Sequence, residues 1–392
     1  MSNKRILYLS YNGLRSHLGQ SQILPYLSAL NQKGYEFFVI SFEEKIKDAP
    51  RIHTDFLHWY PFDRGKGHRV FLFIRNFASG IALALYLMLK YRIRLIHARS
   101  YIPGAAAVIL KRLTPKTKII FDMRGFMLDE YIEGGVLNPR SPWVRLGRFF
   151  EKKIFRNSDA VITLTHRSAP LLKQSHWMGE RKISITVIPC CKPLVESEIR
   201  KNGHWDGAER KEIRLIYACS LGSWYDFPRM LSFFESFQRK FPDSTLNVLS
   251  PQADAVRNIV EKSRLREKIK LAAVPFSEVH RYLAIADIGL LFYQPGFSRI
   301  GTSPIKFPEY LWAGLAVAAT PNIGDLDNLV TKYKVGVILD SSDEEAAERI
   351  VTLLKDPQLA QRCRWVAKEF YNIQGGIQRY EEVYQGALEP KC

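Results

Sequence analysis

Short apolar runs alternate with segments of helical periodicity along the whole of this 392-residue chain. Helices between such runs indicate parallel strands buried on both faces, because each helical crossover returns the chain to the same direction. The sequence therefore predicts an α/β fold. In the first half the strand-like runs are Lys4–Ser10, Glu36–Phe42, Arg94–Ala98, Lys118–Asp122, Ala160–Leu164 and Ile185–Pro189.

A second set of strand-like runs follows a polar, charged and glycine-containing stretch. The chain is too long for one small core and suits two domains. We predict two doubly wound, Rossmann-like parallel-sheet domains facing a cleft, formed by residues 1–195 and 213–373 and joined by a linker at 196–212. The second set comprises Ile213–Ala218, Leu246–Leu249, Ile269–Ala272, Ile288–Phe292, Leu315–Ala319 and Val335–Leu339.

The two halves of the chain differ in charge. Residues 1–200 contain 32 Lys and Arg against 15 Asp and Glu, a net charge of +17, whereas residues 201–392 carry only +1. A cationic first half predicts an acidic partner, either nucleic acid or an anionic membrane surface. Arg64–Arg69 and Arg140–Arg156 are rich in cations, and the second also carries aromatics, a mixture that suits a membrane interface or a solvated helix face. We favour the membrane because no nucleic-acid-binding signature is visible.

The most apolar segment is Val70–Lys90. Arg75 and Asn76 interrupt it and leave Phe77–Leu89 uncharged, which is too short to span a bilayer. We expect a core helix here, with an interfacial helix as the alternative.

Cysteine content and the N-terminal sequence indicate the compartment. The five cysteines are odd in number and lack metal-ligand spacing, and strand-like residues begin at once after Lys4 and Arg5, without a preceding signal segment. We expect a reduced, cytoplasmic protein.

A glycine- and serine-containing loop follows the Ile288–Phe292 run and leads into a short helix. Ser303 is the predicted N-cap, Pro304 suits the first helical position, and Gly314 can end the helix. Free backbone N–H groups beside a helix N-terminus bind anions, because the unpaired donors and the positive end of the dipole coincide.

Lys306 and Glu309 lie on one face of this predicted helix, three residues apart. Lys306 adds a positive charge, and Glu309 can accept two hydrogen bonds from a ribose diol. Together they fit a nucleotide diphosphate. The alternative is an ordinary ion pair on a solvated helix face.

In the first half, polar residues fall at the carboxyl ends of predicted strands, where doubly wound sheets bind ligands. Gly19 follows the first strand at the phosphate-loop position, without the dinucleotide fingerprint. His97 ends the third strand, and Asp122 and Arg124 end the fourth. They are candidates for orienting a substrate; a hydrogen-bonded histidine and a structural ion pair are the alternatives.

Asp325 and Asp327 form an Asp-x-Asp pattern of the kind that binds metal in some sugar transferases. Here the pattern opens a late helix, where carboxylates favour the helix dipole. We therefore predict no metal site.

The stretch Ser303–Gly314 resembles the donor-binding signature of glycosyltransferase family 4, a retaining group with the GT-B fold. The stretches Leu18–Gln22, His97–Pro103, Phe121–Phe126 and Cys219–Tyr225 resemble a subgroup of that family. The resemblance covers nearly the whole chain. It implies that a C-terminal helix at 374–392 crosses back to the first domain.

The resemblance implies roles for individual residues. Glu309 would hold the ribose, and Lys306 with loop N–H groups would stabilise the diphosphate, so that neither a metal nor a cofactor is required. The implied donor-binding residues are Gly19, Gln20, Gly222, Arg299, Thr302, Ser303, Lys306 and Glu309. The implied catalytic residues are His97, Asp122 and Arg124.

The sequence departs from the family pattern at three places. Asp122 stands where members often place a catalytic histidine, and Ser220 and Tyr225 stand where an Arg and a Lys usually neutralise the diphosphate. Gly301 replaces the glutamate that usually contacts the donor sugar. The pattern therefore does not identify the donor sugar. Neutralisation of the diphosphate is expected from Lys306, with Arg299 or Arg124.

We expect a retaining, metal-independent glycosyltransferase that moves a sugar from a nucleotide-diphosphate donor to a lipid-linked or polysaccharide acceptor in cell-surface glycan assembly. It would act at the inner face of the cell membrane, bound peripherally through its basic half. Two alternatives are a sugar-nucleotide epimerase of the same fold and a non-enzymatic protein that binds nucleic acid through its basic face.

Overall fold

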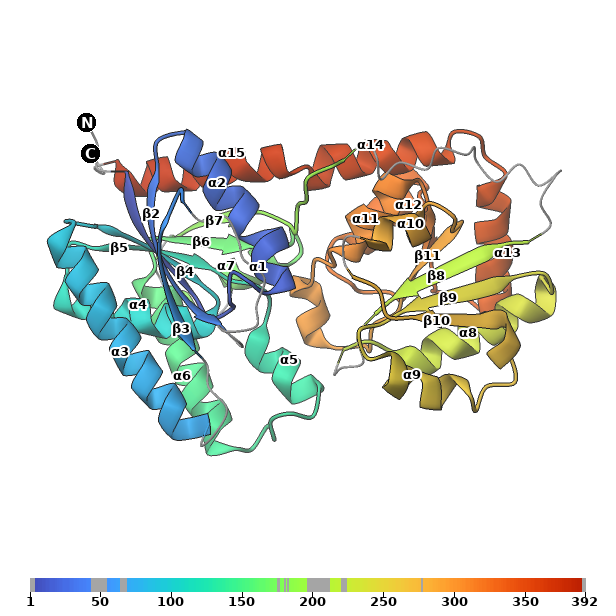
Figure 1. Ribbon diagram of the computed structural model, residues 1–392, viewed down its shortest axis with the longest axis horizontal. Helices are drawn as coiled ribbons and strands as arrows, with labels where there is room; N and C mark the ends of the chain where they lie inside the picture. The colour runs from blue at the N-terminus through green and yellow to red at the C-terminus, as the bar shows by residue number, and fades with distance from the viewer. Residues whose placement is uncertain are drawn as a thin grey trace. The chain divides into compact units, whose positions relative to one another are not determined.

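The computed structural model describes residues 4–43, 55–63, 69–174, 177–179, 181, 183–195, 212–219, 224–275 and 278–389. The chain forms two compact units, and each is built on its own parallel sheet (Figure 1). Unit 1 contains Met1–Leu128, Asn138–Pro189 and Ile373–Cys392, and unit 2 contains Asp129–Leu137 and Cys190–Asn372.

Unit 1 has a seven-stranded sheet in the order β3-β2-β1-β4-β5-β6-β7, with every pair parallel. Its central strands are almost wholly buried, as their apolar runs predicted. The strand β3, with the sequence HWYPFD, was not predicted, because its half-exposed residues give no apolar run. The strands are β1 (Arg5–Ser10), β2 (Glu36–Glu43), β3 (His58–Asp63), β4 (Leu95–Arg99), β5 (Lys118–Asp122), β6 (Ala160–Thr163) and β7 (Ser184–Val187).

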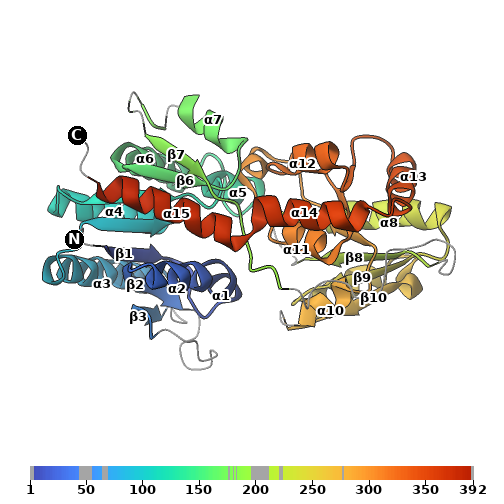
Figure 2. The ribbon, with the colours of Figure 1, turned by 90° about the horizontal axis from the view of Figure 1, so that it is seen from above.

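Helices cover both faces of this sheet, with α2 and α15 on one face and α3, α4 and α6 on the other (Figure 1). The C-terminal helix α15 belongs to unit 1 and runs along its sheet (Figure 2). The helices are α1 (His17–Gln22), α2 (Leu24–Gln32), α3 (Arg69–Lys90), α4 (Tyr101–Leu113), α5 (Met127–Glu133), α6 (Pro142–Asn157), α7 (Ser168–Gln174) and α15 (Ile373–Leu388).

Unit 2 has a six-stranded parallel sheet in the order β10-β9-β8-β11-β12-β13. The strands are β8 (Arg214–Ala218), β9 (Thr245–Leu249), β10 (Ile269–Ala272), β11 (Ile288–Leu291), β12 (Ala316–Ala319) and β13 (Gly336–Ile338). The helices are α8 (Phe227–Lys240), α9 (Ala253–Val260), α10 (Val279–Leu283), α11 (Lys306–Ala313), α12 (Leu326–Tyr333), α13 (Asp343–Leu354) and α14 (Leu359–Tyr371), with the short 3-10 helices η2 (Arg266–Lys268) and η4 (Phe297–Gly301).

The unit boundaries differ from the predicted ones in one respect. Asp129–Leu137 lies in the sequence of the first half but packs with unit 2, so that the helix α5 begins in unit 1 and ends in unit 2. Unit 2 also begins at Cys190. Nearly all of the predicted linker, residues 196–211, lies outside the described residues.

The core-helix prediction for Val70–Lys90 is wrong. This segment forms most of the 22-residue helix α3, yet only 28% of its Phe73–Lys90 window is buried. Ala84, Leu87 and Met88 pack into the core, whereas Ile74 and Leu89 are exposed. By length and composition, α3 is the one helix in the described part of the chain that could cross a membrane.

Candidate functional site

The loop after β11 forms η4 and then enters α11, which starts at Lys306. Thr302 N donates to Arg299 O at 3.0 Å, and this bond closes η4. Ser303 is not the helix cap that we predicted, because Ile305 occupies that position and Ser303 Oγ accepts a hydrogen bond from Cys190 N at 3.1 Å. Gly314 ends α11 in the left-handed conformation, as predicted, with φ 85°.

Lys306 and Glu309 form a largely buried pair at the start of α11. Lys306 Nζ lies 3.0 Å from Glu309 Oε2, and Glu309 is 3% exposed. Within the described part of the chain, neither carboxylate oxygen of Glu309 accepts a hydrogen bond of ordinary geometry. The alternative of a solvated surface ion pair is therefore wrong. A buried carboxylate with unfilled acceptor positions is costly by itself, and the two hydroxyls of a ribose would fill them.

Tyrosine and cysteine side chains surround this pair at the end of β8. Ala218 N donates to Tyr310 Oη at 3.0 Å, and the Tyr310 ring packs directly on Gly289 of β11. A Cβ at Gly289 would lie 2.3 Å from that ring, so β11 needs glycine there. Burial raises the pKa of Cys219 to about 12, against the opposing charge of Lys306, so the thiol is neutral. Gly222 lies outside the described residues.

Arg299 is held by a carboxylate that we did not predict. It is 4% exposed, its Nη2 donates to Ser298 Oγ at 2.6 Å, and the same nitrogen lies 3.7 Å from Glu133 Oε2. Ser298 N donates to Glu133 Oε1 at 3.0 Å, and Ser298 Oγ donates to Glu133 Oε2. Gly296 allows this close approach, since a Cβ there would lie 2.3 Å from Glu133 Oε2. Glu133 thus anchors Asp129–Leu137 to η4 through Ser298 and Arg299.

Glu130 is a second acidic residue of this segment, and it is not among the site residues predicted from the sequence. Burial raises the pKa of Glu130 to about 7, the charge of Arg299 opposes the rise, and Glu133 and Asp129 reinforce it. Its carboxyl group is therefore partly protonated near neutral pH, when it can both donate and accept a hydrogen bond. Burial beside like charges is typical of functional carboxyl groups.

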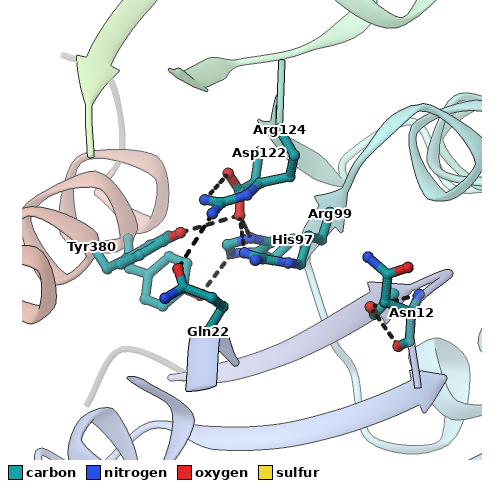
Figure 3. A network of polar contacts seen from close by, with 9 residues as sticks. Asn12, Gln22, His97, Arg99, Asp122, Arg124 and Tyr380 are labelled. Atoms are coloured by element: carbon teal, nitrogen blue, oxygen red, sulfur yellow. Dashed lines mark hydrogen bonds and ion pairs between the residues drawn. The ribbon is translucent and has the colours of Figure 1, made fainter. Parts of the chain in front are cut away.

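The three predicted catalytic residues converge at the carboxyl ends of β4 and β5 (Figure 3). Asp122 is the centre of this cluster. Its Oδ2 accepts from Arg99 Nη1 at 2.9 Å and from Tyr380 Oη at 3.1 Å, and it lies 3.4 Å from His97 Nε2. Arg124 Nη1 lies 3.5 Å from Oδ1.

Burial and charge set the protonation of this cluster. His97 and Asp122 are both 0% exposed. Burial raises the pKa of Asp122, but Arg124 and Arg99 outweigh it and hold that pKa well below its ordinary value. Burial lowers the pKa of His97 against the charge of Asp122, so the imidazole is neutral at pH 7, and its Nδ1 lies 2.7 Å from Tyr384 Oη. Only Arg124 among the three predicted catalytic residues reaches solvent, with 15% of its side chain exposed.

Gly19 and Gln20 lie in unit 1, apart in sequence and unit from the other predicted donor residues. Ser16 caps α1 by accepting from Gly19 N at 3.1 Å, and a Cβ at Gly19 would lie 2.3 Å from Gly13 O. Gln20 is exposed and donates to Arg15 O at 2.9 Å. Gln22 is the residue of this turn that reaches the cluster, through a 3.5 Å contact of its Oε1 with Arg124 Nη2.

The described residues contain no group of three or more His, Cys, Asp or Glu side chains that could hold a metal ion. Asp325 is the residue before α12, and the Asp327 carboxylate accepts from Asn322 N at 2.8 and 3.1 Å. This pair therefore closes a turn and opens a helix. Independence from metal remains a prediction.

Comparisons with known proteins agree with this architecture. Residues 20–191 match the family model of a glycosyl transferase 4-like domain. A search of curated proteins found no significant match in sequence.

Among solved structures, sucrose-phosphate synthase from Thermosynechococcus elongatus is 17% identical, with a TM-score of 0.70 over 97% of this chain and 98% of that one. HepE from Anabaena, in complex with UDP, is 14% identical, with a TM-score of 0.67 over 97% and 100% of the two chains. WaaG, a glycosyltransferase involved in lipopolysaccharide biosynthesis, is 14% identical, with a TM-score of 0.66 over 97% and 100%. Residues 20–191 therefore resemble a glycosyl transferase 4-like domain, and the chain as a whole has the fold of GT-B glycosyltransferases.

Proposed function

We propose that this protein is a retaining glycosyltransferase that takes a sugar from a nucleotide-diphosphate donor bound by unit 2 and transfers it to an acceptor bound by unit 1. One observation carries the proposal. Glu309 is buried at the start of α11, one turn from Lys306, and among the described residues neither of its carboxylate oxygens accepts a hydrogen bond of ordinary geometry. Two adjacent ribose hydroxyls would donate hydrogen bonds to the Glu309 carboxylate. The diphosphate would then form an ion pair with the Lys306 ammonium group.

The chemistry follows from this exchange of partners. Departure of the nucleotide places negative charge on the diphosphate, and a fixed cation with backbone N–H groups stabilises that charge. Lys306 supplies the cation and Ser303 a backbone N–H group of the loop before α11, whereas the N–H group of Thr302 already donates to Arg299 O. His97 and Asp122 are fully buried, which favours a positioning role for them. A leaving phosphate oxygen would then accept the proton of the acceptor hydroxyl.

Exposed apolar side chains beside cations support a lipid-linked acceptor at a membrane. On α6, the side chains of Trp143 and Phe149 are 68% and 53% exposed, and Lys153 Nζ lies 5.5 Å from the centre of the Phe149 ring. On α3, Ile74 and Leu89 are 58% and 65% exposed. Aromatic and cationic residues together suit an anionic interface. The proposed setting is cell-surface glycan assembly at the inner face of the membrane.

A panel of nucleotide sugars tests the donor assignment. The correct donor should raise the melting temperature by mass action, and UDP-glucose is the first to try because HepE was solved with it. Donor turnover with an acceptor should give a product whose anomeric configuration, measured by NMR, matches that of the donor. Inversion would contradict the proposal. Conversion of one nucleotide sugar into another without acceptor would establish the epimerase instead.

Vesicle binding tests the membrane assignment. The double variant Trp143→Ser, Phe149→Ser should bind phosphatidylglycerol vesicles about 100-fold more weakly than wild type, because each buried aromatic side chain contributes at least about 1.5 kcal/mol. Co-sedimentation at several salt concentrations measures the effect. Trp365→Ser, which removes a 49% exposed tryptophan from unit 2, is the control and should bind like wild type. Equal binding by the double variant, or preferential binding of oligonucleotides, would contradict the assignment.

A further inference from the structure

Glu130 lies beside η4. It precedes Glu133 by three residues on α5, so the two side chains project from one face of the helix. Glu133 contacts η4, because it accepts from Ser298 N at 3.0 Å and lies 3.7 Å from Arg299 Nη2. The charge of Arg299 also acts on Glu130, as this placement requires. Both carboxyl groups therefore belong to unit 2, although their helix begins in unit 1.

The side chain of Glu130 has no internal partner in the part of the chain that the structure describes. It forms neither a hydrogen bond nor an ion pair there, and it is only partly buried, so a ligand can reach it. Burial raises its pKa to about 7, and the charge of Arg299 offsets this rise only in part. An ionised carboxyl group at this position therefore costs stability. Proteins keep such costly groups mainly where they contact a substrate.

The chemistry of a carboxyl group favours a ligand with hydroxyl groups. Its oxygens accept hydrogen bonds from hydroxyls, whereas its negative charge repels a phosphate. The helix η4 has the sequence FSRIG and offers no carboxyl group of its own. Gly301, its last residue, stands where the family pattern has the glutamate that contacts the donor sugar. Glu130 brings a carboxyl group to η4 from a different segment of the chain.

We propose that Glu130 binds hydroxyl groups of the donor sugar, in the place of the glutamate that is missing at Gly301. This inference rests on the proposed function, in which unit 2 binds the donor. Glu309 and Lys306 would hold the ribose and the diphosphate, and Glu130 recognises the sugar attached to them. Glu133 is a positioning residue, because it fastens α5 to η4. Glu130 thus determines donor specificity and takes no part in breaking the glycosidic bond.

The difference in affinity between a nucleotide sugar and its own nucleoside diphosphate tests the assignment, because only the first carries the sugar. The probes are UDP-glucose and UDP, or the matching pair for the donor that stabilises the wild type most. In calorimetry, Glu130→Ala should bind the nucleotide sugar at least about 10-fold more weakly and the nucleoside diphosphate at least as tightly as wild type. Glu130→Gln keeps a hydrogen-bond acceptor without the charge and should show a smaller loss.

The melting temperature of the unliganded protein separates contact with the sugar from a structural role. Glu130→Ala removes an unpaired carboxyl group and should leave this temperature unchanged or raise it. Glu133→Ala removes the partner of Ser298 and Arg299 and should lower it. Glu261→Gln, at an exposed position after α9 in the same unit, is the matched control and should bind both probes like wild type.

Three results would overturn the inference. Unchanged affinity of Glu130→Ala for the nucleotide sugar would show that the sugar does not contact Glu130. An equal loss of both probes, with a lower melting temperature, would show a structural role. An equal loss of the nucleotide sugar in Glu261→Gln would show a general effect of charge. A failure of the proposed function is distinct, since the wild type itself would then bind no nucleotide sugar.

Discussion

Replacing Glu309 with alanine is expected to abolish the stabilisation of the protein by UDP. The carboxylate would accept two ribose hydrogen bonds, and hydrogen bonds to a charged acceptor contribute about 1.5–3 kcal/mol each. The loss should therefore weaken UDP binding by at least about 100-fold. Titration calorimetry measures the affinity directly, and the melting temperature with and without UDP gives an independent readout.

Pyrophosphate distinguishes the role of Glu309 from a general disturbance of the donor site. It lacks ribose but retains the charge that Lys306 recognises, so Glu309→Ala should bind pyrophosphate at least as well as wild type. Glu348→Ala removes an exposed carboxylate of α13 in the same unit and should leave both ligands unaffected. Wild-type affinity of Glu309→Ala for UDP would show that another residue binds the ribose.

Replacing Asp122 with asparagine is expected to destabilise unit 1 by about 3–5 kcal/mol, because it removes the carboxylate that pairs with the fully buried Arg99. Because the chain has two units, it need not unfold in a single cooperative step. Calorimetry with saturating UDP should separate them, because the proposed donor site lies in unit 2 and UDP should shift the transition of that unit alone. Glu36→Gln, which removes a half-exposed partner of Arg5 and His58, should cost less than about 1 kcal/mol.

The effect of Asp122→Asn should also depend on pH. The folded-state pKa of Asp122 lies below its ordinary value, so the unfolded state takes up the proton first as the pH falls. The stabilisation is present above the ordinary pKa of 3.8 and is lost as the pH falls below it. The difference between wild type and Asp122→Asn should therefore shrink as the pH is lowered from 7 toward 3. An equally large difference at both pH values would argue against a stabilising ion pair.

Local pattern was sufficient to predict the parallel sheets and the position of α11. Buried strands such as β4 and β11 are continuous apolar runs, because helices cover both of their faces. The spacing of Lys306 and Glu309 places both side chains on one face of any helix that contains them. Gly314 ends α11 because glycine adopts the left-handed conformation without strain. These features depend on residues that are close in sequence.

Whether a side chain is buried, and which distant group it contacts, was decided only by the tertiary structure. From spacing alone, a surface ion pair was as well supported as a ligand-binding pair for Lys306 and Glu309. The packing around α11 buries Glu309, which is 3% exposed. The apolar composition of α3 predicted a core helix, although one of its faces has no partner in the described structure. Composition alone does not determine which faces of a helix are covered.

The sequence by itself determined the fold class, the helix that carries Lys306 and Glu309, and the strand ends that carry His97 and Asp122. The tertiary structure alone decided that Glu133 holds Ser298 of η4 and that Tyr384 contacts His97, a residue 287 positions away. Strand and helix patterns arise from neighbouring residues, whereas these contacts arise when chain reversals bring remote segments together. Local periodicity in the sequence therefore does not predict these long-range contacts.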